Sequence, residues 1–210
     1  PAAMQQQPSS VRLLVVDMHN VLFLQSNDPK DHLIAFIRDK GGDLDEDEIN
    51  ELHRQGTLGR LSSHDFWKQV GVEGESQSID KEYVLSFDLR SGVKDFLQTM
   101  HKRGVPIGVV TNDFAEWSHA LRDLYGLHGM QPWVVSAESG VRKPDPAAFE
   151  VLRKAAGIPF QSCLVIDGSE NVLDSAANLG MKTVFLNSGG NSKLSSNHPV
   201  VRKLSEFTRR

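Results

Sequence analysis

The sequence lacks the features of a disulfide-bonded, membrane-spanning or nucleic-acid-binding protein. Its single cysteine, Cys163, cannot form a disulfide within the chain, which fits a reducing cytoplasm. The net charge is -4 and acids and bases are mixed along the chain, so no basic surface for nucleic acid or an anionic membrane is expected. No apolar run approaches the roughly 20 residues that cross a bilayer. We therefore expect a cytoplasmic protein without a nucleic-acid or membrane partner.

Other common signals are also missing. Residues 1–10 show no basic region followed by an apolar one, so we expect no secretory signal there and exclude them from the fold as disordered or left over from expression. No repeat of fixed period is visible, and the eight histidines show no paired spacing typical of zinc ligands. What remains is a chain of 210 residues with 39% hydrophobic and 24% charged content. That is enough for one sizeable domain, or for a core domain with a smaller insert.

The first patterned stretch is an apolar run that ends in an aspartate. Leu13–Val16 is short and unbroken, which is typical of a buried parallel strand because helices cover both faces of such a sheet. Asp17 follows at the carboxyl end, where open α/β sheets bind their ligands. Asp17 is therefore a candidate active-site carboxylate, although an aspartate in this place also commonly begins a turn.

The chain after this strand has two different patterns. From residue 26 to residue 87 apolar residues recur at helical spacing and no strand is predicted. From residue 88 onward, helical stripes alternate with short apolar strands. The predicted strands are Val105–Val110, Trp133–Val135, Leu164–Ile166 and Thr183–Leu186. This alternation predicts an α/β fold with a three-layer, Rossmann-like parallel sheet. The core is expected at residues 11–25 and 88–210, with an all-helical cap inserted at residues 26–87.

Polar residues accumulate where the predicted strands end. Asp17 follows the first strand, Thr111 and Asn112 follow the second, Asp167 follows the fourth, and Lys143 lies in a loop before a helix. Parallel strands would bring these groups to one edge, where carboxylates can hold Mg²⁺ and a hydroxyl and an ammonium can bind phosphate. Each residue alone also fits an ordinary turn, cap or surface position. Together they favour a site in which Asp17 attacks phosphorus and forms an aspartyl-phosphate.

These segments resemble the four motifs of the haloacid dehalogenase-like (HAD) hydrolase superfamily. The corresponding segments are Asp17–Leu22, Val109–Asn112, Lys143–Phe149 and Val165–Ser169, the last leading to a helix that ends in Gly180-Met181. The resemblance runs from about Arg12 to Leu186, and the helical insert lies where the small cap of the family belongs. It implies a hydrolase, most often a Mg²⁺-dependent phosphatase acting on a small phosphorylated metabolite.

The resemblance also implies a role for each residue at a motif position. Asp17 would be the nucleophile, Thr111 the donor to the phosphate, and Lys143 the lysine that neutralises charge. Asn20 and Asn112, which lie beside these positions, are expected to contact the substrate.

Two departures from the family pattern concern the metal and the proton. The carboxylates of Asp17 and Asp167 and the main-chain carbonyl of His19 would hold the Mg²⁺. However, His19 stands where phosphatases of the family place a second aspartate that acts as general acid. Gly168 stands where the fourth motif commonly has a second acid.

Three functions therefore remain open from the sequence. In a phosphatase, His19 would act as the acid, since the pKa of a free histidine is about 6.5. In a hydrolase of the haloacid dehalogenase type, which also lacks the second aspartate, Asp17 would attack carbon without a metal. In a catalytically impaired relative, the chain would only bind a ligand. In the cap, Arg60, Trp67 and Lys68 are the residues expected to meet a substrate tail, although Trp67 also fits a core position.

Overall fold

The strand β1 (Leu13–Val16) lies inside a parallel sheet, with a neighbouring strand on each side. The computed structural model describes residues 11–189 and 196–209, so the expectation for residues 1–10 lies outside the described residues. In this part of the chain the strand order is β3-β2-β1-β4-β5-β6, and every neighbouring pair is parallel. The other strands are β2 (Ile107–Thr111), β3 (Trp133–Val135), β4 (Cys163–Asp167), β5 (Lys182–Leu186) and β6 (Val200–Val201). The predicted α/β fold with a Rossmann-like parallel sheet is confirmed.

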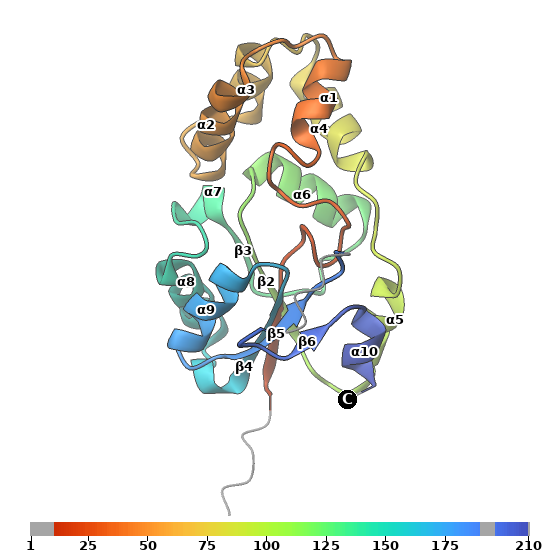
Figure 1. Ribbon diagram of the computed structural model, residues 1–210, viewed down its shortest axis with the longest axis vertical. Helices are drawn as coiled ribbons and strands as arrows, with labels where there is room; N and C mark the ends of the chain where they lie inside the picture. Colours follow the sequence, from red (N-terminus) through yellow and green to blue (C-terminus); the bar gives the residue numbers. More distant parts are fainter. Residues whose placement is uncertain (1–10, 190–195, 210) are drawn as a thin grey trace, which may run out of the picture.

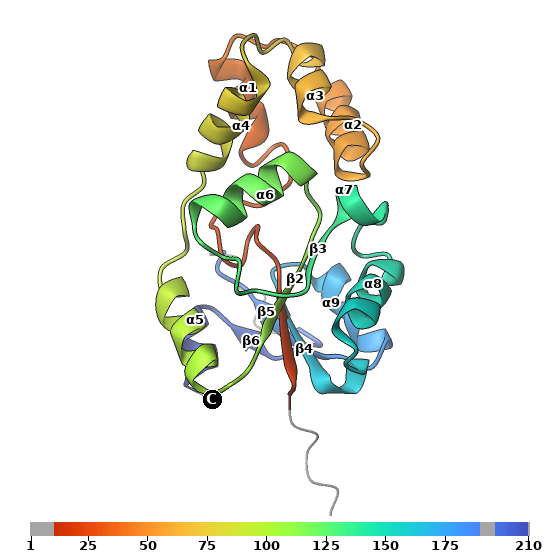
Figure 2. The ribbon, with the colours of Figure 1, turned by 180° about the vertical axis from the view of Figure 1, so that it is seen from behind.

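Helices cover both faces of the sheet, which is why its strands read as continuous apolar runs. The helices that accompany the sheet are α5 (Val93–Lys102), α6 (Ala115–Leu124), α7 (Ser136–Ser139), α8 (Pro146–Ala156), α9 (Glu170–Asn178) and α10 (Leu204–Thr208). Leu14 and Val16 belong to the apolar core shared with α5 and α10, while Leu13 and Val15 belong to the core shared with α8 and α9. Figures 1 and 2 show these two helix pairs on opposite sides of the sheet.

Four helices lie between β1 and α5, and they gather beyond the carboxyl ends of the strands (Figure 1). They are α1 (Leu33–Asp39), α2 (Glu46–Thr57), α3 (Ser63–Gln69) and α4 (Ser76–Leu85). The side chain of Asp45 accepts a hydrogen bond from the N–H of Asp47, and that of Ser62 accepts one from the N–H of Asp65. Side-chain N-caps therefore determine where α2 and α3 begin.

A buried aspartate joins these helices to α6 beneath them. Oδ1 of Asp80, in α4, accepts hydrogen bonds from the indole N–H of Trp67 at 2.8 Å and of Trp117 at 2.7 Å. Its Oδ2 accepts a hydrogen bond from the hydroxyl of Ser63 at 2.8 Å. Three donors satisfy the carboxylate, so its burial is tolerated. Trp67 is therefore a core residue rather than a contact for a substrate tail.

Several elements of the structure differ from the predicted ones. β2 begins at Ile107 rather than at Val105, because Pro106 has no N–H to donate to the sheet. The segment Ser136–Ser139, for which no element is predicted, forms the short helix α7. β6 and α10 are not predicted from the sequence, because a strand of two residues and a helix of five carry too short a pattern.

Among the helices of residues 11–189 and 196–209, none combines the length and the apolar character needed to cross a membrane.

Candidate active site

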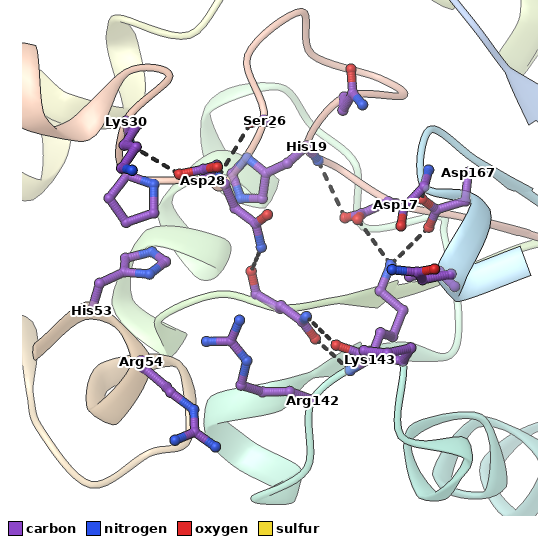
Figure 3. A pocket seen from close by; sticks show the side chains of 18 of the residues that line it. Asp17, His19, Ser26, Asp28, Lys30, His53, Arg54, Arg142, Lys143 and Asp167 are labelled. Carbon is purple, nitrogen blue, oxygen red and sulfur yellow. Dashed lines mark hydrogen bonds and ion pairs between the residues drawn. The ribbon is translucent and has the colours of Figure 1, made fainter. Parts of the chain in front are cut away.

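Two aspartates at the ends of adjacent strands share one lysine. β1 and β4 are parallel neighbours, so Asp17 and Asp167 emerge at the same edge of the sheet. Nζ of Lys143 lies 2.8 Å from Oδ2 of Asp17 and 3.0 Å from Oδ2 of Asp167 (Figure 3). All three side chains are buried. One ammonium between two carboxylates leaves a net negative charge, and this charge attracts a further cation.

Asn112, directly after β2, holds the backbone of Lys143. Its Oδ1 accepts a hydrogen bond from the Lys143 N–H at 2.8 Å, and its Nδ2 donates to the Lys143 carbonyl at 2.9 Å. Burial alone would lower the pKa of Lys143, but the carboxylates of Asp167 and Asp17 outweigh it and raise the pKa. Burial raises the pKa of Asp167, and the charge of Lys143 opposes that shift. Asn112 therefore positions a lysine that stays charged, and both polar ends of its side chain are engaged in doing so.

The ring of His19 is tied to an aspartate from the neighbouring strand end. Its Nε2 lies 3.0 Å from Oδ2 of Asp113, and both side chains are buried. Asp113 is fixed in turn, because its N–H donates to Oγ of Ser136 at 3.0 Å and its Oδ1 accepts from the N–H of Phe114 at 2.9 Å. Burial alone would lower the pKa of His19, but Asp113, and Asp17 at longer range, outweigh it and raise the pKa. Nδ1 of the ring has no partner among the described residues, so the second proton of the charged ring is not held by the protein.

The other predicted residues lie around this centre in different ways. The N–H of His19 donates to Oδ1 of Asp17 at 3.3 Å, so the backbone folds back on that carboxylate. Thr111 is buried at the end of β2, and its hydroxyl has no partner in the described part of the chain. Thr111 does not line the cavity next to this centre, whereas Asn20 does. The side chain of Asn20 covers Gly168.

The carboxylates open onto a cavity of about 700 Å³, a size suited to a small ligand. Figure 3 shows Asp17 and Asp167 on one side of this cavity and Arg54, from α2, on the other. The two charged residues of the helical segment that were expected to meet a substrate tail, Arg60 and Lys68, do not line it.

Arg142, directly before Lys143, reaches from the core toward α2. Its Nη1 donates to the hydroxyl of Thr57, which donates to the carbonyl of Arg54 at 3.0 Å. Burial, together with the charge of Arg54, lowers the pKa of Arg142. Burial, together with the charge of Arg142, lowers the pKa of His53 to about 3, so this histidine is neutral near pH 7. Among the described residues, no ion pair neutralises either arginine.

Most of the predicted site residues meet at this one cavity. Those that line it are Asp17, His19, Asn20, Asn112, Lys143 and Asp167. Asp113 is not among the predicted site residues, although its position directly after Asn112 at a strand end could have indicated it. Arg54 and Arg142 are not predicted either. The same holds for Arg90, whose Nη2 donates to the carbonyl of Asn20 at 3.1 Å. No pattern in the sequence marks Arg54 or Arg90.

The donor chemistry of the site suits a hard divalent cation. Asp17 and Asp167 present carboxylate oxygens, which Mg²⁺ prefers. Within residues 11–189 and 196–209, no group of three or more His, Cys, Asp or Glu side chains gathers as a metal site. A Mg²⁺ site commonly uses one or two carboxylates and keeps several waters, so the residues present fit this ion.

Comparison with protein families and with characterised proteins gives a consistent result. A family model for haloacid dehalogenase-like hydrolases matches residues 11–180. A phosphatase of Mycobacterium tuberculosis is 26% identical over 141 residues, which cover 66% of this chain and 63% of that protein. A phosphoglycolate phosphatase of Pseudomonas fluorescens is 32% identical over 144 residues, which cover 67% of this chain and 53% of that protein. The chain thus spans little more than half the length of these curated relatives.

Solved structures show the same fold. A HAD family enzyme of Bacteroides thetaiotaomicron, determined as a magnesium complex, matches with a TM-score of 0.71 at 18% identity. The match covers 88% of this chain and 98% of the other.

Proposed function

This chain belongs to the haloacid dehalogenase-like hydrolase family, and we propose that it is a Mg²⁺-dependent phosphatase acting on a small phosphorylated substrate. One observation carries this proposal: Lys143 lies between the carboxylates of Asp17 and Asp167 at the edge of a cavity large enough for a small ester. The phosphatases among the relatives support the same activity.

Asp17 is the proposed nucleophile because it combines exposure to the cavity with fixed geometry. Its two oxygens are held by the N–H of His19 and by Nζ of Lys143. In the first step an oxygen of Asp17 forms a bond to phosphorus while the bond from phosphorus to the alcohol oxygen breaks. In the second step water attacks phosphorus, the bond to Asp17 breaks, and inorganic phosphate leaves.

His19 is the proposed proton carrier. The alcohol that leaves in the first step needs a proton, and the nearby carboxylate of Asp113 raises the pKa of His19, which favours its protonated form. Because Nε2 is engaged by Asp113, the charged ring would give its proton from Nδ1, a buried atom without a hydrogen-bond partner among the described residues. The same ring then takes up a proton from the attacking water, so the protein returns to its starting state.

Lys143, and a Mg²⁺ ion held by the carboxylates, would both offset the negative charge of the nucleophile and the phosphoryl group. Lys143 stabilises the negative charge of the nucleophile and of the phosphoryl oxygens. Asp17, Asp167 and the carbonyl of His19 would hold the Mg²⁺, which, when bound, further offsets that charge.

The far side of the cavity indicates which kind of substrate fits. That side is lined by three basic residues, Lys30, Arg54 and Arg142, and by one carboxylate, that of Asp28, so positive charge is in excess there. Guanidinium groups match carboxylates and phosphates in shape and charge. We therefore propose a phosphate ester that carries a second anionic group, for which phosphoglycolate, named for the Pseudomonas fluorescens relative, is the first compound to test.

The proposed function is tested by phosphate release from p-nitrophenyl phosphate and from phosphoglycolate. We expect release with Mg²⁺, none with EDTA, and none from Asp17→Asn. Asp39→Asn removes an exposed carboxylate of α1, outside the cavity, and should behave as the unmodified protein. Chloride release from 2-chloropropionate in EDTA would instead indicate attack on carbon. No turnover of either class of compound would indicate a ligand-binding relative.

A further inference from the structure

Asn20 occupies the space in which a side chain at residue 168 would begin. A Cβ placed on Gly168 would lie 2.2 Å from Nδ2 of Asn20 and 2.9 Å from its Cγ. Distances this short are not found between such atoms in proteins, so a side chain at residue 168 and the carboxamide of Asn20 in its present position exclude each other. Gly168 follows Asp167 directly, so the carboxamide lies beside the carboxylate centre.

The backbone of Asn20 is held in an unusual conformation. Asn20 has a φ of 60°. In the described part of the chain, it is the only residue other than glycine that has a positive φ. Arg90 fixes this turn, because its Nε donates to the carbonyl of Val21 at 2.8 Å and its Nη2 donates to that of Asn20 at 3.1 Å. The N–H of Asn20 donates to the carbonyl of Gln25 at 2.9 Å. Both the N–H and the carbonyl of Asn20 therefore have hydrogen-bond partners within the protein.

The side chain of Asn20, in contrast, has no hydrogen-bond partner within residues 11–189 and 196–209, although it lines the cavity with Asp17 and Asp167. A half-turn of the carboxamide exchanges its oxygen and nitrogen without breaking any hydrogen bond to the protein. The turn with a positive φ, held by Arg90, thus places a carboxamide without a protein partner at the cavity that Asp17 and Asp167 also line.

We propose that Asn20 supplies, through its carboxamide oxygen, the donor to the Mg²⁺ site that no side chain at residue 168 can supply. Gly168 has no side chain to occupy the space beside Asp167, and the side chain of Asn20, from the end of the neighbouring strand, occupies it instead. The metal-binding function expected of a side chain at residue 168 is thereby transferred to Asn20. Carbonyl oxygens are suitable Mg²⁺ ligands alongside carboxylates. This inference rests on the metal of the proposed function, and it assigns Asn20 to the metal rather than to the substrate.

Calorimetric titration of Mg²⁺ alone into the substrate-free protein tests the inference. We expect Asn20→Gly to weaken Mg²⁺ binding by at least about 10- to 100-fold, which is the effect of removing even an outer-shell partner of a metal ligand. Glycine adopts a positive φ without strain, so the melting temperature of this variant should not fall. A loss of affinity therefore cannot come from misfolding. Asn50→Ala removes a carboxamide from the α2 side of the same cavity, and its Mg²⁺ affinity should be unchanged.

A double variant tests the exchange directly. Asn20→Gly combined with Gly168→Asp moves the oxygen donor from one strand end to the other, so the affinity lost in Asn20→Gly should return. Equal Mg²⁺ affinity in Asn20→Gly and the unmodified protein, or no Mg²⁺ binding by the unmodified protein, would overturn the inference. Because the titration contains no substrate, Mg²⁺ binding that depends on Asn20 without any phosphate release would contradict the proposed function and leave this inference standing.

Discussion

Nε2 of His19 lies 3.0 Å from Oδ2 of Asp113, and the two buried side chains connect the loop after β1 with the end of β2. By the resemblance of the first motif, His19 stands where phosphatases of the family place a carboxylic acid. A carboxylic acid releases its proton at low pH, whereas a histidine stabilised by an aspartate keeps its proton to higher pH. Under the proposed function, His19 is the proton donor at this position, and Asp113 raises its pKa.

The His19–Asp113 pair should make stability depend on pH. Because the pKa of His19 is raised above 6.5 in the folded state, its contribution is fully present below pH 6.5 and is lost as the pH rises through the folded pKa. We expect the free energy of unfolding of the unmodified protein, relative to that of Asp113→Asn, to fall as the pH rises above 6.5. Urea unfolding over this range measures the difference. His64→Gln, at an exposed histidine of α3, should leave the dependence intact.

The proton carried by His19 should matter most for poor leaving groups. General acid catalysis contributes about 10²- to 10⁴-fold, so His19→Gln should lower kcat for an alkyl phosphate by about that factor. The loss for p-nitrophenyl phosphate should be much smaller, since nitrophenolate leaves without protonation. Steady-state kinetics on both esters measures the ratio. Equal losses on the two esters would show that His19 does not donate the proton.

The arginines on the far side of the cavity should select anionic substrates. A hydrogen bond to a charged group contributes about 1.5–3 kcal/mol, so Arg54→Met or Arg142→Met should lower kcat/KM for phosphoglycolate by about 10- to 100-fold. Ethyl phosphate, which lacks the carboxylate, should be affected little. Arg60→Met is the matched control, because Arg60 follows α2 but does not line the cavity. A parallel loss on both esters would contradict a second anionic group.

Asp80 should be important for stability rather than for catalysis. Asp80→Ala leaves the indole N–H groups of Trp67 and Trp117 and the hydroxyl of Ser63 without their acceptor. Each buried unsatisfied group costs about 1–3 kcal/mol, so we expect a loss of at least about 3 kcal/mol in the free energy of unfolding. Urea unfolding followed by tryptophan fluorescence measures it. Asp80→Asn retains one oxygen acceptor and should lose less; a loss near zero for Asp80→Ala would contradict this role.

The sheet and its functional edge follow from short-range patterns. The apolar runs before Asp17, Thr111 and Asp167 form neighbouring parallel strands, and the carboxyl ends of parallel strands share an edge. For this reason a linear pattern places Asp17, Asp167 and Asn112 at one cavity. β6 could not be found in the same way, because two valines carry no distinct period.

The charged partners of the site depend on how distant segments pack. His19 and Asp113 are separated by 94 positions, and their contact requires both the pairing of β1 with β2 and the exact turn after each strand. Arg54 lines the cavity because it lies on the face of α2 that is turned toward the core. Arg60, six residues later, does not line the cavity. The contact of Asn20 with Gly168 depends on a positive φ that asparagine adopts less readily than glycine. Such relations are set by tertiary packing rather than by local sequence.

Under the proposed function, Asp17 carries the phosphoryl group between the two steps. Acid quenching during turnover of p-nitrophenyl phosphate with Mg²⁺, followed by mass spectrometry of the peptides, measures this directly. We expect one phosphoryl group on the peptide that contains Asp17, and none on that peptide from Asp17→Asn. Continued phosphate release by Asp17→Asn, or a phosphoryl group on a different residue during turnover, would contradict it.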